Sequence, residues 1–228
     1  MPPEPKPGPA RAAVLFDLDG VLIDSPAAHA TAWAEIFQPF GIELPPRRLH
    51  LDEGRKSLDI ARRIADEYNL GLDDRRLLEL IAKKRRIYRR HAPESMRDGV
   101  REVLEAVRDL DWLIGLVSGS APENIFAVLT RDDVGLFDTV VTEADYDAGK
   151  PDPEPFLIAC RRLGAEPHVS IAVENAILGV EAAKSAGMKV IALTSTLSRR
   201  DLKRADYIID DIAELPSLIG RAPIGDGP

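Results

Sequence analysis

The chain has 228 residues, of which 45% are hydrophobic and 30% charged, and its formal net charge at pH 7 is −8. This composition is ordinary for a globular domain with or without a smaller insert, and the negative charge disfavours nonspecific binding to nucleic acid. No apolar run reaches the roughly 18 residues that a membrane-spanning helix needs. Residues 1–11 hold five prolines and no apolar core, so they do not resemble a signal peptide. We therefore expect a cytoplasmic protein with a flexible tail at 1–11.

Six short apolar segments predict the strands of one sheet. They are residues 12–17, 112–117, 139–142, 169–173, 189–193 and 207–210. Their apolar residues do not alternate strictly with polar ones, which is typical of strands buried on both faces of a parallel sheet. Helix-like segments follow most of them, and strand–helix alternation indicates a doubly wound, Rossmann-like α/β fold. In such a fold, active sites lie at the carboxyl ends of the strands.

Over ninety residues separate the first two predicted strands, which is too long for a single crossover connection. Within this stretch, apolar residues at helical spacing predict helices over 57–70 and 73–91. Pro39, Gly41 and the pair at 45–46 are expected to separate helices. The stretch is therefore predicted to form an inserted α-helical domain.

The first predicted strand ends in the segment LFDLDGVLIDS, residues 15–25. Asp17 and Asp19 flank one leucine, so alternation along the strand starts their side chains on the same side. A turn at Gly20 would bend Asp19 over the site that Asp17 faces. Because two close carboxylates repel each other, a bound cation is the simplest remedy, and Mg²⁺ with oxygen ligands fits. The alternative is a pair of turn aspartates, since Asp and Gly are common in turns.

Polar groups also follow three later segments of the predicted sheet. Ser118, in LVSGS, offers a hydroxyl to a phosphate oxygen, and Lys150, before a proline, offers a cation. Glu174 and Asn175 end a strand and precede a helix of small residues. Each has a structural alternative, because Ser118 can cap a helix, Lys150 can be a solvated loop residue and Glu174 can complement a helix dipole. Four such groups at successive strand ends are hard to explain by chance and indicate a phosphate and metal site.

In this order the four segments resemble the four motifs of the haloacid dehalogenase superfamily, from about residue 12 to about residue 213. Within it, the chain resembles the branch that contains β-phosphoglucomutase and small sugar-phosphate phosphatases. The resemblance implies an α/β core domain at 12–25 and 95–218, a helical cap domain at 26–94 and a second tail at 219–228.

The resemblance also implies a role for each motif residue. Asp17 would be the nucleophile that forms an aspartyl-phosphate, and Asp19 the general acid and then the general base. Ser118 and Lys150 would hold the phosphoryl oxygens. The implied ligands of Mg²⁺ are Asp17, the backbone carbonyl of Asp19, Glu174 and Asn175. True dehalogenases lack the second aspartate, so Asp19 indicates phosphoryl transfer, in which a leaving alkoxide needs a proton.

The fourth motif departs from the family pattern, because Asn175 stands where a second carboxylate is usual. Its amide oxygen can still bind Mg²⁺, but without a charge. Whether Glu174 or Asn175 is the direct ligand is left open. The departure also keeps open a catalytically weak protein that only binds phosphate ligands.

Candidate substrate-binding residues lie in the core motifs and at the start of the insert. Gly20 follows the aspartate pair, and Gly119 and Ser120 follow Ser118. His29 stands, by spacing, where mutases of the branch carry a histidine that contacts the acid/base aspartate. Packing within its helix is the alternative for His29.

Two basic residues of the predicted cap are further candidates. Arg55, in Gly54-Arg55-Lys56-Ser57, lies in a segment that resembles the cap loop reaching into the site, where it could bind a second phosphate or a sugar hydroxyl. Lys84 lies on the apolar face of the helix at 73–91, so its charge must snorkel or meet an anion. The remaining histidines, which are expected at the surface, are His50, His91 and His168.

These patterns predict a Mg²⁺-dependent phosphatase that acts on a small phosphorylated metabolite, a sugar or polyol phosphate. The alternative is a β-phosphoglucomutase-type mutase, which would need a second phosphate site in the cap through Arg55 or a neighbour. We expect neither a nucleic-acid nor a membrane partner, and a monomer by default.

Overall fold

The computed structural model describes residues 11–220, so most of the predicted tails at 1–11 and 219–228 lies outside the described residues. Its centre is one sheet of six strands in the order β3-β2-β1-β4-β5-β6, in which every neighbouring pair is parallel. The strands are β1 (Ala13–Phe16), β2 (Leu113–Val117), β3 (Thr139–Val141), β4 (Ile171–Glu174), β5 (Lys189–Leu193) and β6 (Tyr207–Ile209). All six predicted strands and the doubly wound α/β fold are confirmed.

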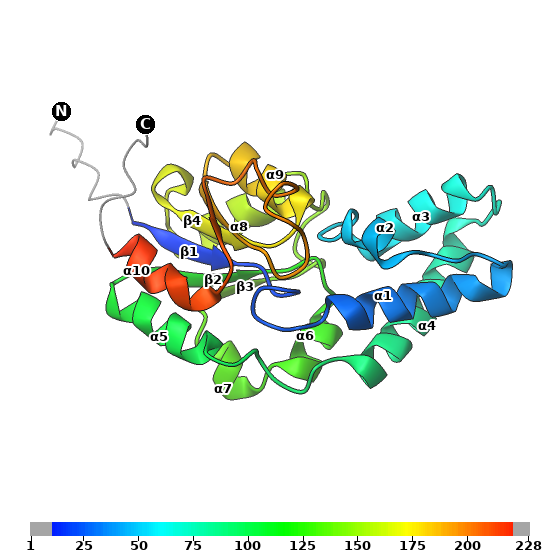
Figure 1. The fold of residues 1–228 in the computed structure, drawn as a ribbon, viewed down its shortest axis with the longest axis horizontal. Helices are drawn as coiled ribbons and strands as arrows, with labels where there is room; N and C mark the ends of the chain where they lie inside the picture. The colour runs from blue at the N-terminus through cyan, green and yellow to red at the C-terminus, as the bar shows by residue number, and fades with distance from the viewer. Residues whose placement is uncertain (1–10, 221–228) are drawn as a thin grey trace, which may run out of the picture.

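Helices cover both faces of the sheet because side chains of each strand alternate between two hydrophobic clusters. In β1, Val14 and Phe16 pack in the cluster that includes α5 and α10, whereas Ala13 and Leu15 pack in the cluster that includes α8 and α9. Figure 1 shows α5 and α10 on one side of the sheet and α8 and α9 on the other. The helices of the core are α5 (Val100–Asp109), α6 (Pro122–Val128), α7 (Arg131–Val134), α8 (Glu154–Leu163), η2 (Pro167–Val169), α9 (Ile177–Ser185), η3 (Ile212–Glu214) and α10 (Leu215–Ile219).

The stretch between β1 and β2 begins as a set of helices with its own hydrophobic cluster, which draws its residues from 28 to 92. Its members are α1 (Pro26–Phe37), η1 (Gln38–Phe40), α2 (Pro46–His50), α3 (Ser57–Glu67) and α4 (Asp74–His91). We call residues 26–91 the helical insert. Figure 1 shows it beyond one end of the sheet rather than over a face.

The two helices predicted within the insert are present. The first, α3, ends at Glu67 rather than at residue 70, and Asn69 just beyond it has a left-handed backbone with φ of 52°. The second, α4, begins after Asp73, whose side chain accepts a hydrogen bond from the N–H of Arg76 and so caps the helix.

The core extends slightly past its predicted carboxyl-terminal boundary. The last helix, α10, ends at Ile219, and this side chain is buried in the same cluster as α5. Ile219, the first residue of the predicted tail at 219–228, is therefore packed in the core. Among residues 11–220, no helix combines the length and the apolar character needed to cross a membrane.

Replacing Leu104 on α5 tests the packing of the core far from the carboxyl edge of the sheet. Its side chain is 1% exposed, so Leu104→Ala is expected to leave a cavity and to lower the free energy of unfolding by about 2–5 kcal/mol. Leu78→Ala is the control, because Leu78 is 53% exposed, and its cost should be about 1 kcal/mol or less. Urea unfolding measures both, and equal costs would contradict the packing described here.

Candidate active site

The candidate site lies at the carboxyl ends of β1, β2 and β4, where neighbouring parallel strands finish together. Asp17 follows β1 directly, Ser118 follows β2, and Glu174 is the last residue of β4. The backbone ladder continues beyond the strands, because the N–H of Asp17 donates to the carbonyl of Val173 at 2.9 Å. The parallel register is therefore what brings residues far apart in the sequence to one edge.

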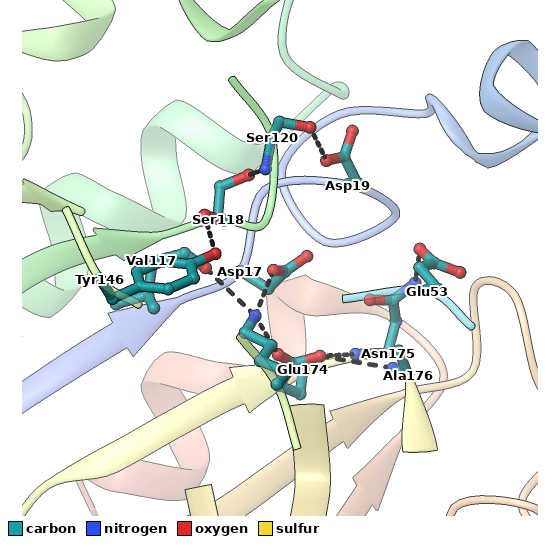
Figure 2. A network of polar contacts seen from close by, with 11 residues as sticks. Asp17, Asp19, Glu53, Val117, Ser118, Ser120, Tyr146, Glu174, Asn175 and Ala176 are labelled. Atoms are coloured by element: carbon teal, nitrogen blue, oxygen red, sulfur yellow. Dashed lines mark hydrogen bonds and ion pairs between the residues drawn. The ribbon is translucent and has the colours of Figure 1, made fainter. Parts of the chain in front are cut away.

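A buried lysine joins two of these strand ends. The Nζ of Lys150 donates to Asp17 Oδ1 and to Glu174 Oε1, both at 2.6 Å, and to the carbonyl of Val117 at 3.2 Å. In Figure 2, the hydrogen bonds to Asp17 and Glu174 are drawn as dashed lines. Lys150 is 1% exposed, so it is not the solvated loop residue that the sequence also allowed.

Burial and charge act against each other in this group. Burial lowers the pKa of Lys150, but the charges of Asp17 and Glu174 outweigh it and hold that pKa above its ordinary value. Burial raises the pKa of Asp17 to about 8, although Lys150 opposes the rise and the neighbouring carboxylates add to it. One ammonium thus serves two carboxylates, and the group has a net negative charge when both are ionised.

The close packing of Glu174 depends on a glycine in α9. A Cβ at Gly179 would lie 1.9 Å from Glu174 Oε1, so a larger residue there would displace the carboxylate. The other oxygen, Oε2, accepts from the backbone N–H groups of Asn175 at 3.1 Å and Ala176 at 3.4 Å. This carboxylate is therefore oriented by the start of α9 as well as by Lys150.

Asp19 lines the cavity, and the chain turns directly after it at Gly20, which has φ of 84°. Its carboxylate accepts three hydrogen bonds, from Ser25 Oγ at 2.5 Å, His29 Nε2 at 2.9 Å and Ser120 Oγ at 2.9 Å. Burial alone would raise the pKa of Asp19, but His29 and the two hydroxyls hold it below its ordinary value. Ser25, which sequence reasoning missed, lies within the motif segment 15–25.

His29 is oriented by Lys84 of the insert. Lys84 Nζ lies 2.7 Å from His29 Nδ1, and the ring of His29 stacks on Tyr88 with centroids 4.1 Å apart. An ammonium can only donate, so Nδ1 accepts and the proton of the neutral ring lies on Nε2, facing Asp19. Burial and the charge of Lys84 lower the pKa of His29. Burial also lowers the pKa of Lys84 to about 8, which keeps Lys84 mainly cationic at neutral pH.

A cavity of about 70 Å³ separates the insert from the strand ends. The sequence-predicted residues that line it are Asp17, Asp19, His29, Arg55, Lys84, Gly119, Ser120 and Glu174. Arg55 donates through Nε to Asp52 Oδ1 at 3.1 Å, and Asp52 is 2% exposed. A buried carboxylate thus holds the guanidinium at the cavity wall, although Asp52 was not among the predicted residues.

Four predicted residues lie behind the cavity wall, namely Gly20, Ser118, Lys150 and Asn175. Ser118 is fully buried, and its Oγ accepts from the N–H of Ser120 at 3.0 Å. It therefore orients Ser120 in this structure. Conversely, His50 lines the cavity and is partly buried, so the prediction of a surface histidine was wrong at this position.

Asn175 and Glu53 each have one buried side-chain oxygen without a hydrogen-bond partner. Asn175 Nδ2 donates to Glu53 Oε1 at 3.0 Å and to Thr196 Oγ1 at 2.8 Å, whereas Asn175 Oδ1 and Glu53 Oε2 are buried and accept no hydrogen bond. Unpartnered oxygens beside Asp17 and Glu174 fit a hard cation such as Mg²⁺. Within residues 11–220, no three His, Cys, Asp or Glu side chains are grouped to hold a metal by themselves, so a cation here would need the amide oxygen of Asn175 or a backbone carbonyl.

Comparison with known proteins identifies the class of enzyme. Residues 12–187 match the model of the haloacid dehalogenase-like hydrolase family, so the chain belongs to that family. It is 32% identical over 203 residues to validoxylamine A 7'-phosphate phosphatase of Streptomyces hygroscopicus subsp. limoneus, covering 88% of this chain and 94% of that one. It is 31% identical over 193 residues to β-phosphoglucomutase of Bacillus subtilis, covering 79% and 82%.

A solved structure shows the same fold. A hydrolase from Pseudomonas syringae superposes with a TM-score of 0.83 at 24% identity, covering 93% of this chain and 100% of that one. The resemblance drawn from the four motifs is therefore confirmed at the level of family and fold. The expectation that the chain is an enzyme of the phosphatase or phosphoglucomutase type is confirmed as well.

Replacing Lys84 tests how His29 is held. In Lys84→Met, the cation that lowers the pKa of His29 is gone, so that pKa should rise, and the ring should lose its fixed tautomer. An NMR titration of the His29 ring measures the change. Lys83→Met is the control, because Lys83 is exposed on the same helix. A pKa of His29 that stays the same or falls in Lys84→Met would contradict this arrangement.

Proposed function

We propose that the protein is a Mg²⁺-dependent phosphatase that hydrolyses a small phosphorylated metabolite, a sugar or polyol phosphate, through an aspartyl-phosphate on Asp17. The observation that carries the proposal is the pairing in one cavity of an acidic nucleophile with a second carboxylate held by three donors. Residues 12–25 and 95–218 would act as the core domain, and residues 26–94 as the cap domain.

In the first step, an oxygen of Asp17 attacks phosphorus, and the bond from phosphorus to the substrate's alkoxide oxygen breaks. Asp19 donates a proton to the leaving alkoxide, which departs as an alcohol. A phosphate beside Asp19 favours this protonation, because a nearby negative charge raises the pKa of a carboxyl. Ser118 and Lys150 would stabilise the phosphoryl oxygens, with Ser118 acting at least through Ser120.

In the second step, water attacks the phosphorus of the aspartyl-phosphate, and the bond to Asp17 breaks to release inorganic phosphate. Asp19, now ionised, takes the proton of that water as general base. The donors Ser25, His29 and Ser120 support this step, since hydrogen bonds to a carboxylate stabilise its ionised form. His29 and Lys84 act by positioning Asp19, and neither needs to change its protonation state.

The residues suited to hold Mg²⁺ are Asp17, the backbone carbonyl of Asp19, Glu174 and Asn175. When bound, the ion supplies positive charge that lowers the repulsion between the anionic phosphate and Asp17. Glu174 already pairs with Lys150, and Asn175 Oδ1 has no partner. We therefore favour Asn175 as a direct ligand.

The substrate class is supported by the cavity between the insert and the strand ends and by the relatives. The cavity is small, and the insert contributes His29, Arg55 and Lys84 to its wall, which suits a compact phosphorylated compound with hydroxyl groups. The names of two relatives, a phosphatase of a phosphorylated metabolite and a phosphoglucomutase, agree with this class. A cytoplasmic setting and a monomeric state stay predictions.

Phosphate release tests the reaction. With Mg²⁺, the protein should release phosphate from a panel of sugar, polyol and short-acid phosphates, and the best substrate should be a sugar or polyol phosphate. Asp17→Asn should lower the rate by at least about a thousandfold, since the amide is a poor nucleophile.

Asp24→Asn is the control, because Asp24 is exposed a few residues away and should leave the rate unchanged. A chelator should stop phosphate release reversibly. Retained activity in pure Asp17→Asn protein would rule out the nucleophile. If no compound is hydrolysed and phosphate binding survives in Asp17→Asn, the protein is instead a binding protein of this fold.

A phosphosugar mutase is the second candidate, and Arg55 is the observation that favours it. Its guanidinium is held by Asp52 at the cavity wall and could bind the second phosphate of a bisphosphate intermediate. In a mutase, the phosphoryl group on Asp17 passes to a second hydroxyl of the substrate rather than to water.

Arg55→Ala separates the two reactions. A mutase should convert a hexose 1-phosphate into the 6-phosphate, and Arg55→Ala should lower this conversion at least about tenfold, because one charge-assisted contact is lost. Arg63→Ala is a matched control, since Arg63 also donates to Asp52 but does not line the cavity. Fast phosphate release without conversion in the parent protein would exclude the mutase.

A further inference from the structure

Glu53 is a carboxylate of the insert that reaches the core. It lies between α2 and α3 and lines the cavity together with Asp17, Asp19 and Glu174. One of its oxygens accepts from Asn175 Nδ2 at 3.0 Å, and the other, Oε2, is buried without a hydrogen-bond partner. Figure 2 shows the side chain of Asn175 between Asp17 and Glu53.

No cation of the protein balances this carboxylate. In the part of the chain that the structure describes, Glu53 forms no ion pair with a Lys, Arg or His side chain. Lys150, the buried ammonium at the strand ends, is already shared by Asp17 and Glu174. A buried carboxylate among other carboxylates is unfavourable unless a cation compensates it.

The position of Glu53 is also relevant to the fourth motif, which departs from the family pattern at Asn175. Asn175 is neutral where a second carboxylate is usual, and its Oδ1 is a second buried oxygen without a partner. The side-chain amide of Asn175 donates an N–H to Glu53, which belongs to the insert. Glu53 therefore places a carboxylate next to the position where the family usually has one.

We propose that Glu53 is a carboxylate of the cation site itself, contributed by the insert, and that it replaces the charge that Asn175 lacks. It would act on Mg²⁺ directly or through a bound water, because oxygen ligands and retained waters are typical of this ion. This inference rests on the magnesium site of the proposed function.

The arrangement couples cation binding to closure of the insert over the core. Glu53 belongs to the insert, whereas Asp17, Glu174 and Asn175 belong to the core. Bringing Glu53 against these carboxylates is unfavourable without a cation and favourable with one. The coupling is reciprocal, so the cation favours the closed arrangement as much as closure favours the cation.

Glu53→Gln tests the proposal without any substrate, because it keeps the shape and an acceptor for Asn175 but removes the charge. Isothermal titration of Mg²⁺ into the full chain should give an affinity about 10- to 100-fold weaker than that of the parent protein. Thermal unfolding should show a crossing: without Mg²⁺ the variant should be as stable as the parent or more so, and with saturating Mg²⁺ it should be less stable.

Glu79→Gln is the matched control, since Glu79 is exposed on α4 and should leave both measurements unchanged. Equal Mg²⁺ affinities of Glu53→Gln and the parent would overturn the role of Glu53 while leaving the magnesium site intact. A variant that is destabilised equally with and without Mg²⁺ would also overturn it, because Glu53 would then only be a hydrogen-bond partner of Asn175. A parent protein that binds no Mg²⁺ would overturn the site and the inference together.

Discussion

The ion pairs of Lys150 with Asp17 and Glu174 are the constraint on which the rest of the site depends. The lysine is almost completely buried at the carboxyl edge of the sheet, and its ammonium bridges the ends of β1 and β4 at 2.6 Å on each side. Removing one partner of such a group typically costs about 3–5 kcal/mol, because an uncompensated charge stays buried. The fold tolerates this arrangement because one ammonium satisfies two carboxylates and a backbone carbonyl at once.

Lys150, Asp17 and Glu174 together have a net negative charge when both carboxylates are ionised, and the rest of the site is arranged around these three residues. On one side, Asp19 is surrounded by donors, and His29 contacts both Asp19 and Lys84. On the other side, Asn175 and Glu53 present oxygens without partners. The first side suits proton transfer by Asp19, and the second suits a cation. In the proposed function, proton transfer and cation binding are thereby separated across the cavity, and Asp17 would take part in both.

The insert contributes side chains to the candidate site as well as covering it. Its hydrophobic cluster is separate from the two clusters of the core, so it can pack on its own while its polar residues face the strand ends. His29, Lys84, Arg55 and Glu53 all come from it. A site built in this way is complete only when the insert and the core are together. We therefore expect substrate specificity to depend on the insert and the phosphoryl-transfer reaction itself to depend on the core.

The sequence by itself determined the sheet, the family and the motif residues. The apolar runs and the order of Asp17, Ser118, Lys150 and Glu174 are local patterns, and parallel strands necessarily end at one edge. Only the tertiary structure decided that Lys84 meets His29, that Asp52 holds Arg55, that His50 lines the cavity and that Glu53 meets Asn175. The contact of Glu53 joins the insert to the core, and that of Lys84 joins two helices of the insert. No periodicity along the chain encodes the distance between such groups.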